Sequence, residues 1–436
     1  MESSGSQDQG RRARVLYITY DGLTDPLGGS QVLPYLTGLA ALGHRITILS
    51  CEKPERMGTD GSSIRQLCER AGIAWHPRKY RKKPPILSSA LDAVALQRAA
   101  IRLHRRERFD VVHCRSYIPA RAGLALKRRL GVRFLFDMRG FWPDEKVEGN
   151  NWNLANPLYA AVYRYFKWLE SQLLTAADHI VSLTEAGKNQ LLTRPGFGSN
   201  GAEISVIPCC VDFDHFQLAT ADARATARRR LGIDANVAVQ AYLGSLGSSY
   251  MLGEMLDFFK VFASRHGRAC FLFVSLEDPQ LVRRTAEARG VDPAMLIIRP
   301  ASRADVPRLM AAADLGIFFI KPVFSKAASS PTKMGEMLAM GLPIVTNAGI
   351  GDVEALIGDM NCGVAISRLA PECYEQALDR IATLPGTPQE RRDRAFRLFD
   401  IGLGIDRYDR IYREIETRNP AASNAASKRD RNSSLE

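Results

Sequence analysis

Strand-like runs alternate with helical stretches along almost the whole chain of 436 residues. This alternation is typical of parallel α/β sheets whose strands are connected by crossover helices. Six runs in the first half are rich in β-branched and aromatic residues: VLYIT (15–19), RITILS (45–50), GIAWH (72–76), DVVHC (110–114), VRFLFD (132–137) and HIVSL (179–183). They predict one doubly wound, Rossmann-like domain.

The same pattern begins again after a polar, Gly-containing break at 196–203. The segment ISVIPCCVDFDHF and an Arg-rich helix follow the break and precede six further strand-like runs: VAVQAYLG (237–244), CFLFV (270–274), LIIR (296–299), LGIFFI (315–320), LPIVT (342–346) and GVAI (363–366). A chain of this length is also too long for one core of ordinary size. We therefore predict the following parts: an N-terminal Rossmann-like domain over 1–199, a C-terminal Rossmann-like domain over 200–404, a helix over 405–418 that returns to the N-terminal domain, and a disordered tail over 419–436.

The charge balance predicts an acidic partner. Lys and Arg total 59 against 47 Asp and Glu, which gives a formal net charge of +12. Phosphate, anionic lipid and nucleic acid all fit this sign, but the basic stretch RKYRKK at 78–83 lacks interleaved aromatic residues, so nucleic acid is not expected. The same stretch, with the partly amphipathic helix after it, fits either an anionic membrane surface or a solvated basic face.

The sequence shows no run of about 18 apolar residues and no apolar stretch behind its first basic residues. We expect a cytoplasmic protein associated with the inner face of the cell membrane. Its eight cysteines include no C-x-x-C pair, so neither a metal site nor a disulfide framework is expected.

Two Rossmann-like domains in series bring the carboxyl ends of two sheets to face each other across a cleft, where open α/β sheets bind ligands. The stretch SSPTKMGEMLAMGLPIVTN at 329–347 predicts a helix that begins there. Ser329 or Ser330 suits the cap and Pro331 the first turn, so the backbone N–H groups of Thr332 and Lys333 are available to an anion.

Three lysines within thirteen residues, Lys321, Lys326 and Lys333, add positive charge suited to a diphosphate. Glu336 follows one turn into the helix, where its carboxylate could accept both hydroxyl groups of a ribose. The alternative is an ordinary helix cap with a solvated glutamate.

In the N-terminal half, Gly28 and Gly29, with Ser30 after them, either permit close backbone approach to a ligand or form a common turn.

Several of these segments together resemble the family-four retaining glycosyltransferases of the GT-B fold, of the type that builds bacterial surface polysaccharides. The resemblance covers nearly the whole chain and rests on these stretches: DPLGGSQVLPYLTGLAALGHRITILS (25–50), FDMRGFWPDEK (136–146), ISVIPCCVDFDHF, RADVPRLMAAADLGIFF (303–319), SSPTKMGEMLAMGLPIVTN (329–347) and NCGVAI (361–366). It implies a C-terminal domain that binds a nucleotide sugar and an N-terminal domain that binds the acceptor.

The resemblance implies that Glu336 is the second glutamate of the family's E-x7-E motif, which holds the nucleotide ribose. The first falls on Ala328, so a carboxylate that usually contacts the donor sugar is missing. The Arg and Lys that grip the diphosphate are also missing from YLGSLGSSYMLGEM (242–255), where Gly244 and Ser245 are assigned to the donor nucleotide instead. Arg299 is assigned to it as well, in the segment near which the family recognises the base.

The resemblance further implies transfer with retention, without a metal or another cofactor, from a nucleotide-diphosphate sugar to a lipid-linked or polysaccharide acceptor. Asp137, Arg139 and Lys333 are our candidates for the reacting centre. Asp144 and Glu145 are candidates for the acceptor side, together with the Gly28–Gly29–Ser30 loop. Each acid has an alternative: Asp137 ends a strand and suits a turn, while Asp144 and Glu145 follow Pro143 and suit a helix start. A GT-B epimerase and a non-catalytic nucleotide-sugar binding protein remain the alternative functions.

Overall fold

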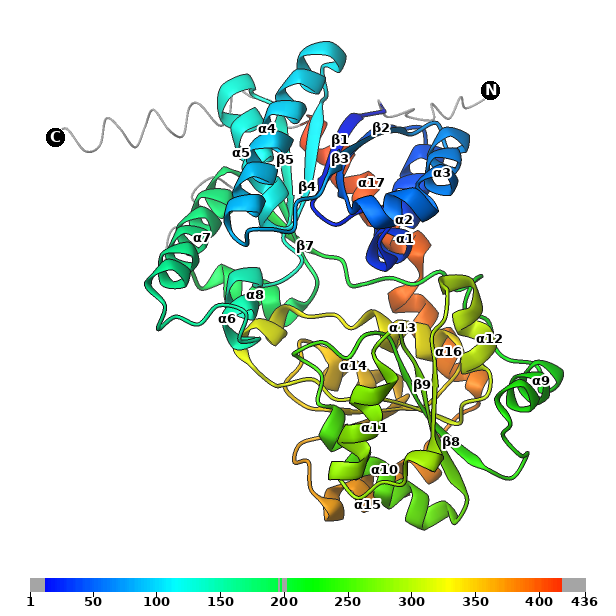
Figure 1. Cartoon of the computed structure of the whole chain (residues 1–436). Helices are drawn as coiled ribbons and strands as arrows, with labels where there is room; N and C mark the ends of the chain where they lie inside the picture. The colour runs from blue at the N-terminus through cyan, green and yellow to red at the C-terminus, as the bar shows by residue number, and fades with distance from the viewer. Residues whose placement is uncertain (1–11, 195–196, 198–201, 418–436) are drawn as a thin grey trace, which may run out of the picture.

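The computed structural model describes residues 12–194, 197 and 202–417, which form two lobes, each built on a parallel sheet (Figure 1). Helices cover the sheets, as expected for strands joined by crossover connections. The prediction of two Rossmann-like domains is confirmed. The predicted tail over 419–436 lies outside the described residues.

The N-terminal sheet has seven strands in the order β3-β2-β1-β4-β5-β6-β7, all paired in parallel. Buried aliphatic and aromatic side chains fill most of these strands because helices pack on both faces. The strands are β1 (Arg14–Thr19), β2 (Arg45–Glu52), β3 (Ala74–Lys79), β4 (Val111–Arg115), β5 (Arg133–Asp137), β6 (His179–Ser182) and β7 (Glu203–Val206). The helices are α1 (Pro26–Gln31), α2 (Leu33–Ala41), α3 (Pro54–Arg70), α4 (Leu87–Glu107), α5 (Tyr117–Leu130), α6 (Trp142–Glu148), α7 (Pro157–Ala176) and α8 (Glu185–Leu192).

The C-terminal sheet has six strands in the order β10-β9-β8-β11-β12-β13, again all parallel. Its strands are β8 (Ala238–Leu243), β9 (Ala269–Val274), β10 (Leu296–Arg299), β11 (Leu315–Phe318), β12 (Ile344–Asn347) and β13 (Gly363–Ile366). Its α-helices are α9 (Ala221–Leu231), α10 (Leu252–His266), α11 (Pro279–Ala288), α12 (Val306–Met310), α13 (Thr332–Ala339), α14 (Val353–Met360), α15 (Pro371–Ala382) and α16 (Pro388–Phe399). Three short 3₁₀ turns complete this lobe: η1 (Pro293–Met295), η2 (Arg303–Asp305) and η3 (Phe324–Ala328).

The domain boundary lies later in the chain than predicted. β7 pairs with β6 in the N-terminal sheet, although its residues were assigned to the C-terminal domain from 200 onward. β7 has only four residues and lies at the sheet edge, where the partly exposed Ile204 and Val206 give no buried run to recognise. The connection between the domains therefore begins near Ile207.

The helix expected over 405–418 is longer and begins at Ile401. This helix, α17 (Ile401–Thr417), leaves the C-terminal lobe and runs along the N-terminal lobe (Figure 1). Tyr408, Ile411, Tyr412 and Ile415 are buried in the core of the N-terminal domain. No helix within the described ranges has the length and apolar character needed to cross a membrane.

Candidate active site

A cavity of about 550 Å³ lies between the two domains, where strands of both sheets end. From the N-terminal domain it is lined by residues that follow β1, β4, β5 and β6, and from the C-terminal domain by residues that follow β8 and β11. Its charged lining residues are Asp21, Arg115, Arg139, Glu145, Lys146 and Lys326. Four cations against two acids make this cavity suitable for an anionic ligand.

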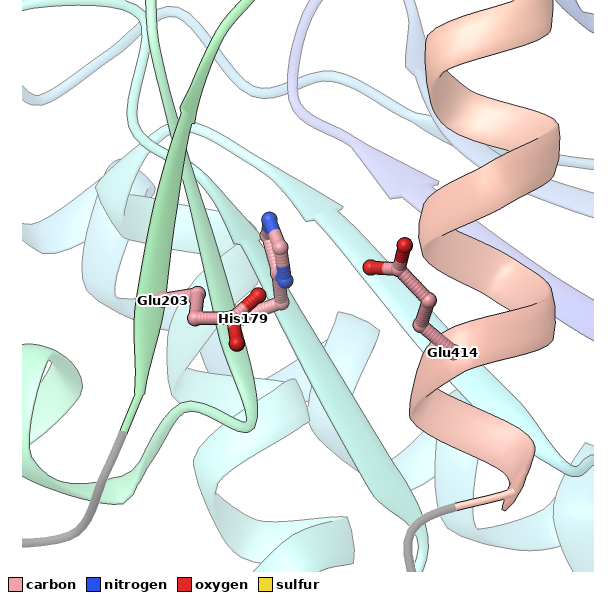
Figure 2. A group of neighbouring side chains, drawn as sticks. All are labelled: His179, Glu203 and Glu414. Atoms are coloured by element: carbon pink, nitrogen blue, oxygen red, sulfur yellow. The ribbon is translucent and has the colours of Figure 1, made fainter.

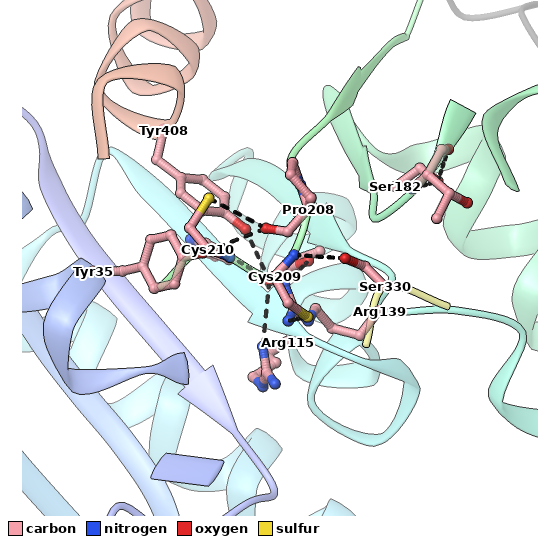
Figure 3. Close-up of polar contacts among 12 residues, drawn as sticks. Tyr35, Arg115, Arg139, Ser182, Pro208, Cys209, Cys210, Ser330 and Tyr408 are labelled. Atoms are coloured by element: carbon pink, nitrogen blue, oxygen red, sulfur yellow. Dashed lines mark hydrogen bonds and ion pairs between the residues drawn. The ribbon is translucent and has the colours of Figure 1, made fainter. Parts of the chain in front are cut away.

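The start of α13 forms part of the cavity wall. Ser329, Ser330, Pro331 and Thr332 all line it. The predicted serine cap is wrong, because Pro331 occupies the N-cap position and no side chain caps the helix. Ser330 Oγ instead accepts a hydrogen bond from the backbone N of Cys209, at 3.1 Å, in the connection between the domains (Figure 3). A helix start without a side-chain cap keeps its positive dipole end available to an anion.

The three predicted lysines lie in different surroundings. Lys326 lines the cavity, and its Nζ lies 2.7 Å from Glu145 Oε1 in an ion pair that joins the two domains. Lys321 is exposed and does not line the cavity. The prediction of Lys321 as a donor ligand therefore finds no support in the geometry, whereas Lys326 and Glu145 are both at the site.

Lys333 is buried behind the cavity wall. Its Nζ lies 2.6 Å from Tyr242 Oη and 3.6 Å from the ring centroid of Tyr250, which itself lines the cavity. Burial lowers the pKa of Lys333 well below its usual range. A Cβ atom on Gly244 would lie 3.5 Å from this Nζ, and Gly244 has φ +100°, so the predicted donor residue Gly244 lies beside Lys333. Lys333 itself does not line the cavity, so it does not occupy its predicted position at the reacting centre.

Glu336 lies on α13 beyond the cavity lining, with 13% of its side chain exposed. Its Oε1 is 3.8 Å from Arg303 Nη1. Burial raises the pKa of Glu336, and the charges of Arg303 and Lys333 partly oppose that shift. Ala328 is buried and packs closely against α8, since a Cβ on Gly187 would lie 2.8 Å from the Ala328 Cβ.

Asp137 is buried beneath the cavity rather than in its wall, so it does not occupy the predicted position at the reacting centre. Its Oδ2 accepts from Tyr408 Oη at 3.2 Å and lies 3.6 Å from His113 Nε2. Burial alone would raise the pKa of Asp137, but the charges of Arg139 and Arg115 and the contact with His113 lower it. Its carboxylate oxygens lie 3.9 Å from Arg115 Nη1 and from Arg139 Nη1, so Asp137 offsets part of the positive charge of these two arginines.

Arg139 lines the cavity as predicted and has φ +58°, a left-handed conformation that few non-glycine residues adopt. One guanidinium nitrogen, Nη2, donates to Cys209 Sγ at 3.2 Å (Figure 3). Ser116, at the end of β4, also lines the cavity and has φ +67°. Unusual backbone conformations at two strand ends are typical of ligand sites.

The remaining predicted acceptor residues do not line the cavity. Asp144 accepts hydrogen bonds from Tyr163 Oη at 2.8 Å and Lys167 Nζ at 2.9 Å, which ties α6 to α7. Gly28 is required by packing, because a Cβ there would lie 2.2 Å from the Gly22 carbonyl oxygen. Gly29 borders open space, and Ser30 Oγ donates to the Pro26 carbonyl oxygen at 2.9 Å.

Two further predicted donor residues also lie outside the cavity lining. Ser245 is exposed, and its carbonyl oxygen accepts from Tyr242 Oη at 2.5 Å. Arg299 is exposed at the end of β10, and its Nη1 donates to the Ile298 carbonyl oxygen.

Sequence reasoning missed Arg115, Asp21 and Tyr250. Arg115 ends β4, with its Nε 3.4 Å from Asp21 Oδ2 and its Nη1 3.9 Å from Asp137 Oδ2. A charged residue directly after a buried strand could have indicated Arg115. The predicted strand DVVHC ended one residue before it, so Arg115 was not considered. Tyr250 follows β8 in the Gly- and Ser-rich stretch and had no signal beyond that position.

One group of metal-type side chains in the described ranges lies away from the cavity. His179 and Glu203 begin β6 and β7, and Glu414 projects toward His179 from α17 (Figure 2). Their ligand atoms all lie within 4.8 Å of one another. Parallel strands begin at the sheet edge opposite their carboxyl ends, so this group is separate from the active site.

Comparison with solved structures identifies the class of fold. A glycosyltransferase from Rickettsia africae matches 94% of this chain and 100% of its own, with a TM-score of 0.68 and 17% identity. HepE from Anabaena, in complex with UDP and glucose, matches 92% and 99%, with a TM-score of 0.66 and 13% identity. The predicted GT-B fold is confirmed.

Comparison of sequences supports the predicted family through a model that matches part of the chain. Residues 30–215 match the model described as Glycosyltransferase Family 4, which confirms the predicted recognition of a family-four glycosyltransferase of the GT-B fold. A D-inositol 3-phosphate glycosyltransferase from Nocardioides sp. is 24% identical over 292 residues, which cover 63% of this chain. The matched part spans 59% of that relative's length.

Proposed function

We propose that this protein is a retaining, metal-independent hexosyltransferase that moves a sugar from a nucleotide-diphosphate sugar to a lipid-linked or polysaccharide acceptor in cell-surface polysaccharide biosynthesis. The observation that carries the proposal is the start of α13, which has no side-chain cap and lies in an interdomain cavity with four cations. The family match supports sugar transfer, and the complex of HepE with UDP and glucose supports a nucleotide sugar as co-substrate.

The chemistry requires stabilisation of a diphosphate as it leaves the sugar. The N–H groups at the start of α13 and the ammonium group of Lys326 face the C-terminal part of the cavity, while Arg139 and Arg115 face it from the N-terminal domain. These preorganised charges offset the developing negative charge. The departing phosphate oxygen takes the proton of the acceptor hydroxyl, so no strong side-chain base is needed.

Association with the inner face of the cell membrane belongs to this proposal. The basic stretch 78–83 leads into α4, where Leu87 and Leu91 are 56% and 51% exposed. Cations beside exposed apolar side chains suit the boundary between anionic headgroups and acyl chains.

The first test is ligand-induced thermal stabilisation by uridine, guanosine, thymidine and adenosine diphosphates and their sugars, without added metal. We expect one base to give a saturable increase in the melting temperature. Lys326→Ala should reduce that increase because Lys326 lines the cavity, whereas exposed Lys321→Ala is the matched control and should retain it.

Product analysis with the stabilising sugar and a panel of lipid-linked and glycan acceptors completes the test. A glycosylated acceptor with unchanged anomeric configuration is the expected product. An epimerised nucleotide sugar, or binding without turnover over the whole panel, would contradict the proposal.

A further inference from the structure

A second cavity, of about 570 Å³, opens beside the first and belongs entirely to the N-terminal domain. Residues from the loop after β3, from α4, α5, α6 and α7 line it. Five residues line both cavities: Tyr20, Ile118, Trp142, Lys146 and Asn151. The two cavities are therefore adjoining, and one extended ligand can occupy both.

Aromatic side chains form much of the wall of this second cavity. Trp142 packs against Trp152 and Phe166, with ring centroids 5.3 and 4.9 Å apart, and Tyr20 packs against Tyr80 at 5.4 Å. All five rings line the cavity. Because these rings pack against one another, their apolar surface is formed before a ligand binds. Such a preformed surface suits the binding of an apolar chain or ring.

The charges at this cavity are all positive. The described residues that line it include Lys82, Arg121 and Lys146 but no aspartate or glutamate. The Arg121 guanidinium lies 5.9 Å from the Tyr165 ring centroid, and Lys146 Nζ lies 5.6 Å from that of Trp142. Apolar walls with only cations select a ligand that is both apolar and anionic.

From the first cavity to the second, the groups that line the walls change in an order that matches the order of chemical groups in one kind of molecule. The reaction cleft comes first, Lys146 stands with Tyr20 and Trp142 where the two cavities meet, and the rest of the aromatic wall lies in the second cavity. Near the aromatic wall, Leu87 of α4 and Trp168 of α7 are exposed, at 56% and 55%. A sugar, a phosphate and a hydrocarbon chain occur in the same order in a lipid phosphate that carries a glycan.

We propose that this aromatic cavity is the binding site for the lipid part of the acceptor, which is a single-chain lipid phosphate or diphosphate rather than a free polysaccharide. This inference rests on the proposed function, since only a transferase needs an acceptor on the N-terminal side of the cleft. Lys146 and Arg121 bind the phosphate, and the rings of Trp142 and Trp152 bind the first part of the chain.

Calorimetric titration of the full-length protein with farnesyl phosphate, farnesol and inorganic phosphate tests this assignment. We expect farnesyl phosphate to bind at least about tenfold more tightly than either of the others, because only it has both groups. Equal affinity for farnesol would overturn the anionic part of the proposal, and equal affinity for phosphate would overturn the apolar part.

A substitution that fills the cavity gives the decisive comparison. Ala90 lines the cavity and is exposed, so Ala90→Trp reduces the cavity without entering the core, and Val94→Trp, one turn further along α4 and outside the lining, is the matched control. Ala90→Trp should weaken farnesyl phosphate binding by at least about tenfold, and Val94→Trp by less than about twofold. Ala161→Trp fills the cavity from α7 and serves if the first variant does not fold.

Two further measurements distinguish a lipid-phosphate site from the nucleotide site and from a general membrane contact. Nucleotide-induced stabilisation should be unchanged in Ala90→Trp, and a wild-type protein that binds farnesyl phosphate but no nucleotide would contradict the proposed function while leaving the cavity assignment intact. If Ala90→Trp weakens binding to anionic phospholipid vesicles but not to farnesyl phosphate, the surface is a membrane contact and the proposal is wrong.

Discussion

At the scale of single residues, Lys333 and Glu336 lie three positions apart on α13, and burial disfavours the charged form of both. Burial lowers the pKa of the lysine and raises that of the glutamate. The charged form of either group therefore reduces the stability of the free protein. A pair of groups kept in this state is typical of a ligand site.

Lys333→Met should separate stability from function. The lowered pKa means that the unfolded chain binds the proton more tightly, so the protonated lysine reduces stability below its unfolded pKa, and stability rises as pH approaches that value. Tyr242 still donates to the Ser245 carbonyl oxygen after the change. We expect the free energy of unfolding at pH 7 to stay within about 1 kcal/mol or to rise, while turnover falls by at least about tenfold.

Denaturant unfolding and steady-state kinetics measure the two effects, and exposed Lys321→Met is the matched control. A large loss of stability with unchanged turnover would make Lys333 a structural residue.

Glu336→Gln should change the pH dependence of donor binding. Because burial raises the pKa of Glu336, its carboxylate loses its charge at a higher pH than an ordinary glutamate, and affinity for the nucleotide sugar should fall as pH decreases through that pKa. At pH 8 we expect the glutamine variant to bind at least about tenfold more weakly, and the two affinities should converge in acid.

The stability of the free protein should change with pH in the opposite direction to the donor affinity. A raised carboxyl pKa contributes stability at low pH that is lost as pH rises through the folded-state value, so Glu336→Gln should be as stable as wild type or slightly more stable at pH 7. Parallel affinity profiles for the two proteins over this pH range would show that Glu336 does not bind the donor.

At the scale of helices and strands, the sequence predicted twelve of the thirteen strands in the described part of the chain, because buried runs of β-branched and aromatic residues identify a parallel sheet. β7 was missed because a four-residue edge strand has no such run. The predicted start of α13 was one or two residues early, because Pro331 and not Ser329 or Ser330 is the N-cap. Local pattern assigns a serine before a helix to the N-cap, whereas here the backbone N of Cys209, 121 residues away, determines its partner.

In the candidate site too, local sequence predicted some residues but not those whose side chains depend on tertiary contacts. Residues adjacent to a strand end or helix start, such as Arg139 and Thr332, were predictable from position, and Lys326 of η3 was predictable from its charge in the segment between β11 and α13. Asp144 was not, since its carboxylate turns toward Tyr163 and Lys167 of the next helix. Which way a side chain points from a short helix depends on tertiary contacts that no local pattern contains.

At the scale of the whole molecule, several contacts hold the two domains together along one side of the cleft. Ser325 N donates to Glu148 Oε2 at 3.0 Å, Lys326 pairs with Glu145, and Thr184 Oγ1 donates to the Ala327 carbonyl oxygen at 2.7 Å. All of these join η3 to the N-terminal domain. A nucleotide diphosphate bound to Lys326, as we propose, would compete with Glu145 and so link donor binding to domain position.

Asp352, at the start of α14, makes a further contact between the domains. Its carboxylate lies at the start of α8 in the other domain, with Oδ2 2.6 Å from Glu185 N and Oδ1 2.9 Å from Ala186 N. The Thr184 side chain already accepts from Gly187 N, so α8 keeps a cap of its own without Asp352. Removing the carboxylate should therefore weaken the contact between the domains without unfolding the helix.

Asp352→Ala should shift the free protein toward an open arrangement of its domains. Hydrogen bonds to a charged group contribute about 1.5–3 kcal/mol, and partial exposure reduces this to roughly 1.4 kcal/mol, or about tenfold in the ratio of closed to open forms. Small-angle scattering should show a larger radius of gyration than for wild type, and saturating nucleotide sugar and acceptor should reduce the difference. Turnover should fall by up to about tenfold because an open site admits water and separates Lys326 from Arg139. An unchanged radius of gyration together with unchanged turnover would mean that the remaining contacts fix the domains, and that closure is not a step of the reaction.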